Sequence, residues 1–366
     1  MTKVVVGISG GVDSAVAAYL LKKEGYEVEG LFMRNWDSMV NNDTHGNPNL
    51  NHSICPQEQD YNDALEVCKK IDIPLHRVDF IKEYWDYVFS YFLDELKKGR
   101  TPNPDLLCNK YIKFDLFKKE AKKLGADFIA TGHYAKTKNG FLYRGIDENK
   151  DQSYFLAMVS HEALKDILFP LGNLEKTKVR EIAEDIHLNV AKKKDSTGIC
   201  FIGERHFQAF LENYLKPNPG DILNVETMEK IGRHTGLMNY TIGQRRNVGI
   251  SGSLMRHYVC GKDVKKNILY VAFGDSDYLY SDACLVEDIH FISDKRPLEC
   301  SAKFRYRGED YPVFLEYQDK FIRVSYPGLV KSVTPGQACV FYLGDECLGC
   351  GIIKEVYKNQ QKLFYL

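Results

Sequence analysis

Short hydrophobic runs alternate with amphipathic stretches through the first half of this 366-residue chain. Runs rich in valine and isoleucine predict buried strands, and apolar residues spaced three or four positions apart predict helices. The predicted strands are residues 3–8, 27–33, 75–80 and 127–131. The predicted helices between them are residues 15–23, 61–71, 81–98 and 112–124. Because strands that alternate with helices pair in parallel through right-handed crossovers, we predict an α/β fold with a doubly wound parallel sheet.

A polar stretch rich in Asn and Asp, residues 35–51, follows the second strand. We predict a long loop there, at the carboxyl ends of the strands, where open α/β sheets usually carry function.

The pattern changes in the second half. Residues 135–146 predict a hairpin that turns at an Asn-Gly pair, and residues 152–158 and 175–186 predict helices. After about residue 220 short alternating runs take over, separated by Gly, Pro, Asp and Asn. These runs are residues 258–260, 268–273, 302–306, 313–317, 321–325, 338–343 and 348–353. They predict a small β-barrel at the C-terminal end of the chain.

Composition narrows the class of protein. The chain is 44% hydrophobic and 27% charged, which is typical of a soluble globular protein, and its net charge of −1 neither favours nor excludes nucleic acid. No apolar run approaches the ~20 residues of a membrane span, and the first strand begins at Lys3, so we expect no signal peptide and no membrane partner. Ten cysteines without an export signal indicate reduced thiols and a cytoplasmic location.

The segment S-G-G-V-D-S at residues 9–14 joins the first strand to the first helix. Backbone N–H groups at such a junction have no helical partner and can bind phosphate, and Gly10 and Gly11 allow close approach. Asp13 would repel phosphate unless a cation lay between them, so we expect it to face Mg²⁺. The P-loop lysine and the dinucleotide-binding glycine spacing are both missing. The alternative is an ordinary strand-to-helix turn.

Two cysteine motifs stand beside features that favour a thiolate. Residues 101–110, T-P-N-P-D-L-L-C-N-K, place Cys108 near a predicted helix start, with a lysine two residues further on. Residues 195–203, D-S-T-G-I-C-F-I-G, place Cys200 after a run of three lysines. The alternatives are a buried structural cysteine and a solvated lysine surface.

Together these stretches resemble the bacterial-type tRNA-specific 2-thiouridylases, members of the ATP pyrophosphatase-loop family that place sulfur on C2 of the wobble uridine. The resemblance covers nearly the whole chain. Its motifs lie at residues 7–14, 32–36, 101–110, 131–134, 150–155, 195–203, 240–245 and 335–337. One departure is local, since Arg246-Asn247 stands where the family usually has Lys-Gly.

The resemblance implies an adenine nucleotide α-hydrolase-like catalytic domain over residues 1–205, a central α+β linker domain over 206–281 and a tRNA-binding barrel over 282–366. It implies ATP as the cosubstrate, with AMP and pyrophosphate as products. The implied ATP-binding residues are Gly7, Ile8, Ser9, Gly10, Gly11, Val12, Asp13, Ser14, Met33 and Gly132. The implied tRNA-binding residues are Asn103, Pro104 and Asp105 at the target base, and His133, Lys150, Asp151, Gln152, Arg305, Tyr306 and Gln337 elsewhere.

The same resemblance makes Cys108 the nucleophile and Cys200 the persulfide carrier, and we expect the two to finish each turnover as a disulfide. We expect Asp105 to act as a general acid/base. The chemistry is coherent, because adenylation of the C2 oxygen makes AMP the leaving group and a second thiolate can break the remaining S–S bond. The implied partners are tRNA and a sulfur-donor protein, either a cysteine desulfurase or a relay protein.

Several other interpretations remain open from the residues alone. An amide or amidine synthase would share the glycine loop, and an RNA-binding protein could carry a vestigial ATP site. Residues 303–307 alternate basic and aromatic side chains, which suits either phosphate contact or a solvated strand face. His133 alone would more often be a core histidine. Cys347 and Cys350 have C-x-x-C spacing, but only Cys339 lies nearby, so we expect no metal site there.

Overall fold

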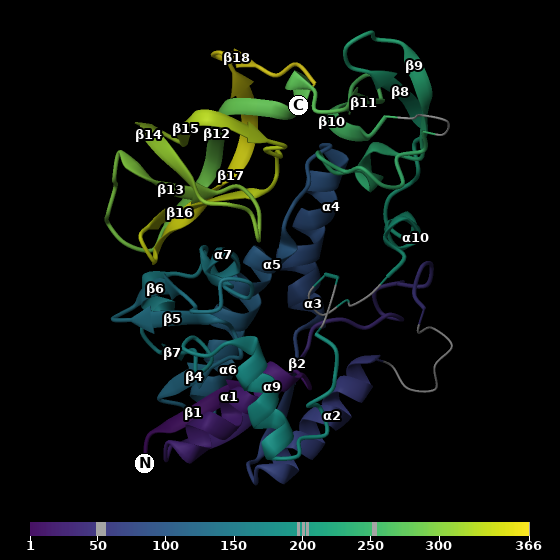
Figure 1. The fold of residues 1–366 in the computed structure, drawn as a ribbon. Helices are drawn as coiled ribbons and strands as arrows, with labels where there is room; N and C mark the ends of the chain where they lie inside the picture. The colour runs from purple at the N-terminus through teal and green to yellow at the C-terminus, as the bar shows by residue number, and fades with distance from the viewer. Residues whose placement is uncertain (49–55, 196–197, 200–201, 203–204, 251–254, 366) are drawn as a thin grey trace.

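The computed structural model describes residues 1–48, 56–195, 198–199, 202, 205–250 and 255–365. Figure 1 shows a helix-covered parallel sheet in the lower part of the molecule, a barrel at the upper left and a small separate sheet at the upper right. The α/β fold class, the small central domain and the C-terminal barrel predicted from the sequence are therefore confirmed.

The first sheet has five parallel strands in the order β3-β2-β1-β4-β7. They are β1 (Lys3–Gly7), β2 (Glu27–Arg34), β3 (Leu75–Asp79), β4 (Phe128–Ala130) and β7 (Ile167–Leu168). The chain runs outward from β1 through β3 and then returns to the other side of β1, so the strand order reverses between β1 and β4. Ligands of open α/β sheets bind at the carboxyl ends of the strands at this reversal.

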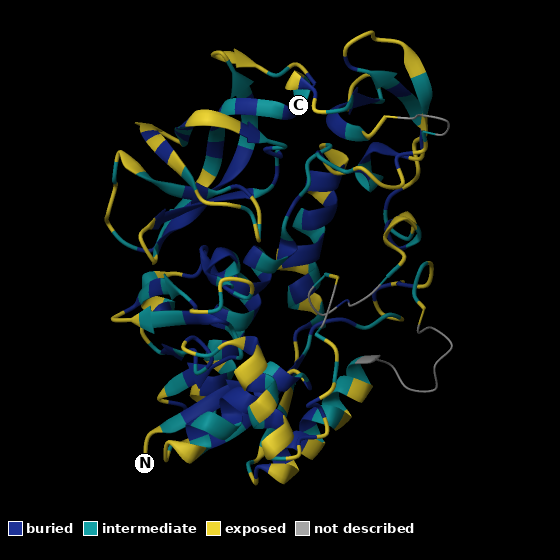
Figure 2. Ribbon diagram, in the orientation of Figure 1, coloured by how far each residue is buried: buried dark blue, intermediate teal, exposed yellow. Residues whose placement is uncertain are grey.

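Helices cover both faces of this sheet. The predicted helix 15–23 lies within α1 (Val12–Lys23), and the predicted helix 61–71 matches α2 (Pro56–Lys70) except for its last residue. Both pack with α9 (Lys176–Asp185) on one face. The other face carries two composite helices. The first consists of α3 (Ile81–Tyr84), the π-helix η1 (Trp85–Phe89) and α4 (Ser90–Lys97), and the second of α5 (Pro104–Leu107), the π-helix η2 (Cys108–Leu116) and α6 (Phe117–Lys123). Figure 2 shows the buried residues concentrated between these helices and the sheet.

A hairpin links the first sheet to the barrel. It consists of β5 (Ala135–Lys138) and β6 (Phe141–Arg144), and its turn has the two left-handed residues Asn139 and Gly140 with φ of 54° and 79°. The predicted Asn-Gly hairpin is therefore confirmed. Strand β6 also pairs with the barrel strand β17, with Tyr143 opposite Glu346, so the hairpin and the barrel share one sheet.

Short helices fill the rest of the α/β part and the start of the central part. They are α7 (Ser153–Leu156), α8 (His161–Leu164) and α10 (Phe207–Glu212), so the helix expected over 152–158 is shorter than predicted. The central sheet has the strand order β10-β11-β8-β9. Its strands are β8 (Gly220–Asn224), β9 (Lys230–His234), β10 (His257–Asp263) and β11 (Ile268–Phe273), with a 3₁₀ turn η3 at Leu237–Asn239.

Six strands close the barrel, because β12 pairs with both β15 and β17. They are β12 (Tyr280–Phe291), β13 (Glu299–Lys303), β14 (Tyr311–Gln318), β15 (Phe321–Lys331), β16 (Ala338–Leu343) and β17 (Glu346–Lys358), with η4 (Asp277–Leu279) before them and β18 (Gln361–Lys362) after them. The strand predicted over 302–306 is wrong at its end. It stops at Lys303, and Arg307 adopts a left-handed φ of 57°, which turns the chain away from the sheet.

Among the described residues, no helix combines the length and the apolar character that crossing a membrane requires.

Candidate active site

The glycine loop lies at the carboxyl end of β1, where the strand order reverses. Gly10 has φ of 74°, and a Cβ atom there would lie 2.2 Å from the backbone oxygen of Asp60, so only glycine fits. The Ser9 N–H donates to the Ser14 hydroxyl oxygen at 3.1 Å, and that hydroxyl donates to the Gly11 carbonyl at 3.1 Å. These bonds fix the loop against the first turn of α1, whose N–H groups face the reversal point and suit a phosphate.

Gly132 brings the end of β4 against the same loop. A Cβ atom on Gly132 would lie 2.7 Å from the backbone of Asp13 and Ser14, so the close approach requires a residue without a side chain. Met33, also implied for ATP, lies almost fully buried in the neighbouring strand β2.

A lysine that the loop sequence lacks is supplied from α9. The Lys176 ammonium donates to both carboxylate oxygens of Asp13, at 2.7 and 2.8 Å, and lies 2.8 Å from an oxygen of Asp195. The Tyr134 hydroxyl donates to Asp13 as well, at 2.7 Å. Lys176 therefore bridges the glycine loop and the segment that begins the second cysteine motif.

Asp195 is held ionised by the cations around it. Burial raises the pKa of this carboxyl, but hydrogen bonds from Lys150 and Lys176 outweigh that effect and lower its pKa to about 2. Arg180 adds a third contact at 2.8 Å. Lys150, implied as a tRNA contact, has its ammonium engaged with Asp195.

The chemistry of Asp13 fits the predicted Mg²⁺, since carboxylate oxygens are the ligands this ion prefers and each keeps lone pairs beyond its bonds to Lys176 and Tyr134. Within the described part of the chain, no group of three or more His, Cys, Asp or Glu side chains could hold a metal by itself. A bound ion would therefore share its coordination with phosphate oxygens.

Of the three lysines before the second cysteine motif, one contacts the glycine loop and two are exposed. Lys193 donates to the Gly10 carbonyl at 2.9 Å and pairs with Asp60 and Asp63, so its charge supports the glycine loop. Lys192 and Lys194 are exposed. Cys200 lies outside the described residues, so the predicted effect of this run on its thiol stays a prediction.

The first cysteine motif forms a capped helix start. The Asn103 side chain accepts a hydrogen bond from the Asp105 N–H at 3.1 Å, and Pro104 occupies the first helical turn. Cys108 begins the π-helix η2 and is 0% exposed. Asp105 and Cys108 are three residues apart, a spacing that places them on one side of the helix. The thiol has to leave this buried position to act on a substrate.

The other implied tRNA residues near the sheet are held by internal bonds. Asp151 is buried and accepts from the Ser153 hydroxyl at 2.9 Å, while Gln152 accepts from the Tyr134 N–H at 3.1 Å. His133 bonds the Thr131 hydroxyl at 2.7 Å. Burial and the nearby Lys113 hold the pKa of His133 well below its usual range, so its imidazole is neutral.

Turns of the barrel reach the first cysteine motif. The Gln337 amide donates to the Thr101 carbonyl at 2.6 Å, and the Tyr306 ring lies 4.3 Å from the ring of Phe155. The Phe155 carbonyl in turn accepts from the Asn109 side chain at 2.9 Å, one residue after Cys108. Arg305 is exposed on the same turn as Tyr306.

The C-x-x-C cysteines belong to the hydrophobic core. Cys347 and Cys350 are 1% and 0% exposed, and burial raises the pKa of the Cys350 thiol to about 12. Thiols held protonated in this way act as small apolar residues.

Comparison with known proteins adds three family matches and many relatives. The family described as "tRNA methyl transferase HUP domain" matches residues 2–204, "tRNA methyl transferase PRC-barrel domain" matches 208–273 and "Aminomethyltransferase beta-barrel domain" matches 281–353. A tRNA-specific 2-thiouridylase MnmA of Mycoplasmopsis synoviae is 55% identical over 99% of this chain and 98% of its own length. The protein of that name from Staphylococcus aureus is 50% identical over 100% of this chain and 98% of its own length. Among solved structures, NMN synthetase from Francisella tularensis is 21% identical over 53% of this chain and 66% of that chain, with a TM-score of 0.32 that is too low to bear on function.

Proposed function

Because this chain belongs to the family of tRNA-specific 2-thiouridylases, we propose that it is an ATP-dependent sulfurtransferase that converts the wobble uridine of tRNA to 2-thiouridine. The observation that carries the proposal is the glycine loop at the carboxyl end of β1, where Lys176 of α9 joins Asp13 in that loop to Asp195 of the second cysteine motif. The family descriptions that mention methyl transfer leave methylation as the competing activity. Full-length relatives with the thiouridylase name favour thiolation.

The proposed reaction has three steps that balance. The C2 oxygen of uridine attacks the α-phosphorus of ATP and releases pyrophosphate. The terminal sulfur of a Cys200 persulfide then bonds to C2, and AMP leaves with the oxygen. Finally the Cys108 thiolate attacks the Cys200 sulfur, which releases the 2-thio base and leaves a disulfide between the two cysteines. A sulfur-donor protein and a thiol reductant restore the enzyme.

The chain's own residues would serve these steps as follows. The glycine loop and Lys176 would hold the phosphates, and Asp13 would hold Mg²⁺, which supplies charge neutralisation when bound. Asn103, Pro104 and Asp105 would receive the base beside Cys108. Arg305, Tyr306 and Gln337 would contact the tRNA from the barrel, together with His133 and residues 150–152.

Nucleoside mass spectrometry of tRNA incubated with the protein, ATP and a sulfur source tests this function. We expect a 2-thiouridine nucleoside, with AMP and pyrophosphate formed only when tRNA is present. A methylated nucleoside, an aminated product or ADP would contradict the proposal. ATP consumption at the same rate with and without tRNA would also contradict the proposal, because adenylation of the uridine requires tRNA.

Replacing Lys176 by Met should weaken ATP use. The substitution leaves Asp13 with its hydrogen bond from Tyr134 but without the Lys176 cation, and removes one of the three cations around Asp195. Negative charge beside the phosphates is then less well balanced, which is costly at a partly buried site. We expect kcat/KM for ATP to fall on the order of 10–100-fold, because a lost partly buried charge contact is worth about 1.5–3 kcal/mol. Initial rates of AMP release at varied ATP measure this.

Lys176→Arg is the matched control, since it keeps the charge, and Lys178→Met removes a lysine of the same helix that pairs only at the surface with Glu181. Lys178→Met should leave the rate unchanged. An equal loss in Lys176→Met and Lys178→Met would show that Lys176 has no specific role.

Reversing Arg305 to Glu should weaken tRNA binding in a salt-dependent way. An exposed arginine on the barrel turn is suited to a phosphate contact, which contributes equally for all tRNA sequences. We expect a lower affinity and a salt slope reduced by about 1, measured by filter binding across a salt series. Lys320→Glu, in the turn between β14 and β15 of the same barrel, carries the same charge change as a control. Identical losses in both variants would indicate only a net-charge effect.

A further inference from the structure

Two consecutive apolar side chains stand out of the loop that follows β2. Met39 and Val40 are 75% and 68% exposed, and the loop from Asp37 to Asn47, here called the 37–47 loop, carries them at its tip. We propose that this tip is the docking surface for the protein that delivers sulfur as a cysteine persulfide. The inference rests on the proposed thiolation and names the surface that its protein donor recognises.

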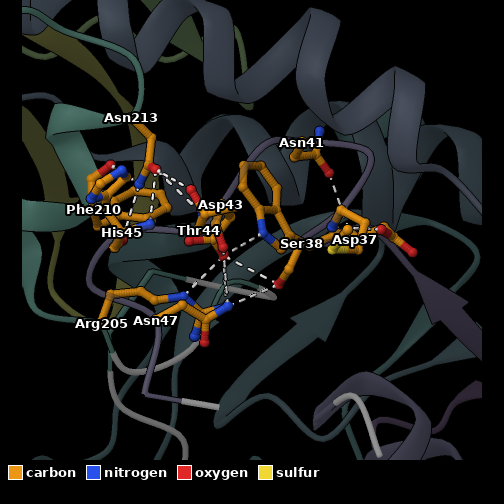
Figure 3. A network of polar contacts seen from close by, with 12 residues as sticks. Asp37, Ser38, Asn41, Asp43, Thr44, His45, Asn47, Arg205, Phe210 and Asn213 are labelled. Atoms are coloured by element: carbon orange, nitrogen blue, oxygen red, sulfur yellow. Dashed lines mark hydrogen bonds and ion pairs between the residues drawn. The ribbon is translucent and has the colours of Figure 1, made fainter. Parts of the chain in front are cut away.

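The tip is held in one conformation by its own hydrogen bonds. One Asp37 carboxylate oxygen accepts from the N–H groups of Met39 and Val40, both at 2.9 Å. The Asn41 side chain accepts from the Asp37 N–H at 3.0 Å, and the other Asp37 oxygen pairs with Arg34 at the end of β2. Figure 3 shows Asp37 and Asn41 turned toward each other at this point. The apolar pair is thus presented by an ordered turn, which lowers the entropy lost on binding.

The base of the 37–47 loop is anchored to the segment that follows the second cysteine motif. Asp43 is 0% exposed and accepts from Arg205 at 2.8 and 3.0 Å and from the Trp36 indole N–H at 3.0 Å. The Asn213 side chain accepts from the His45 N–H at 2.9 Å and donates to the His45 carbonyl at 3.0 Å. Figure 3 shows Arg205 and Asn213 reaching the loop from two sides. Breaking a buried pair of this kind is costly, so the loop keeps its place relative to Arg205.

This anchoring ties the docking surface to the sulfur acceptor. Arg205 follows Cys200 by five positions, and a chain of that length spans at most about 17 Å. A donor must bring its persulfide into bonding contact with Cys200. Because Arg205 is bonded to the base of the 37–47 loop, the surface of the bound donor should lie near that loop.

The composition of the loop favours a protein over RNA. The 37–47 loop contains no Lys or Arg, whereas RNA binding depends on cations that neutralise phosphates. Its two carboxylates, Asp37 and Asp43, form ion pairs within the protein with Arg34 and Arg205. Across the described residues, no other two neighbours in sequence are both large, apolar and exposed. Apolar side chains of this kind form the centre of protein–protein interfaces.

The transfer itself balances without an external oxidant. The Cys200 thiolate attacks the outer sulfur of the donor's Cys–S–SH group, and the donor's S–S bond breaks. The donor cysteine leaves as a thiolate, and Cys200 becomes the persulfide.

The test compares two sulfur sources with a double variant, Met39→Ser with Val40→Ser. A cysteine desulfurase loaded with persulfide from cysteine is the protein donor, and glutathione persulfide is the small donor that carries the same outer sulfur without an interface. We expect kcat/KM for the protein donor to fall about tenfold or more, as for loss of an interface anchor, with glutathione persulfide giving wild-type rates. Met228→Ser, which changes a methionine that is 50% exposed between β8 and β9, should match wild type with both donors.

Each outcome separates the docking surface from the function. Equal rates of the double variant and wild type with the protein donor would overturn the docking surface and leave the thiolation intact. Equal losses with both donors would also overturn it, because the loop would then serve Cys200 or the fold. Weaker tRNA binding would make the loop an RNA surface instead. If the wild-type protein formed no thiolated product with the protein donor and none with glutathione persulfide, the proposed function itself would be rejected.

Discussion

Cys200→Ser should abolish thiolated tRNA completely, and Cys108→Ser should stop the same reaction one step later. In the proposed chemistry Cys200 accepts the sulfur, so its loss removes the persulfide and all product. Cys108 only releases the product, so Cys108→Ser should still load sulfur on Cys200. The reaction should then stall with tRNA joined to the protein through the Cys200 sulfurs. Denaturing gels with labelled tRNA would detect that covalent complex, and a reductant would release the tRNA by cleaving the S–S bond.

In the wild-type protein the two cysteines should form a disulfide during one turnover. Disulfide geometry needs Cα atoms within about 7 Å, and Cys108 is 0% exposed at the start of η2, so the thiol has to move outward first. Non-reducing peptide mapping after a single turnover should find the linked pair. Cys300→Ser is the control, because burial raises the pKa of that thiol to about 12 and leaves it inert. Thiolated tRNA that accumulates while Cys108 and Cys200 stay unlinked would refute this mechanism.

Features set by short-range sequence were predictable. The valine-rich run of β1, the glycine loop and the start of α1 follow one another within a few residues, so periodicity and turn chemistry are enough to define them. The Asn139-Gly140 hairpin is of the same kind, since left-handed φ values at both positions select these residues.

Features set by distant contacts were not predictable. Lys176 reaches Asp13 across 163 positions of sequence, and nothing in the surroundings of Lys176 distinguishes it from other helical lysines. The 35–51 stretch was correctly expected to be a loop up to its described end, but its order depends on Arg205 and Asn213, about 160 positions away. No sequence signal shows which distant partners such polar residues select.

Local backbone irregularities escaped prediction for a different reason. In the sequence that forms the π-helix at Cys108, the apolar residues are spaced as they would be in an α-helix. The periodicity that predicted a helix therefore could not reveal the π-helix or place the thiol in the core. The barrel turn was missed because basic and aromatic residues alternate at positions 303–307, a pattern that also occurs in strands. In the structure Tyr306 packs on Phe155, and Arg307 turns the chain. Both irregularities lie at residues implied in catalysis or tRNA binding.

The same helix start leads to the second large effect, which is the loss expected when Asp105 becomes Asn. Uridine O2 is a weak nucleophile while N3 keeps its proton, and a carboxylate beside the base can take that proton as O2 attacks the α-phosphorus. Asp105 lies on the helix that Asn103 caps and Pro104 begins, three residues before Cys108, so base and thiol would share one pocket. General acid–base help is typically worth ~10²–10⁴-fold.

Asp105→Asn keeps the size and hydrogen-bonding capacity of the side chain but removes its basicity. We therefore expect kcat to fall by about 10²–10⁴-fold while the affinity for tRNA stays near that of wild type, because the lost interaction belongs to the transition state. Single-turnover rates of AMP formation at saturating tRNA give the first quantity, and fluorescence anisotropy with labelled tRNA gives the second. Asp115→Asn in η2 is the matched control, since Asp115 is half-exposed and pairs with Lys119 at 2.8 Å on the helix surface. A wild-type rate in Asp105→Asn, or a loss confined to tRNA affinity, would assign Asp105 to binding and leave the proton to another group.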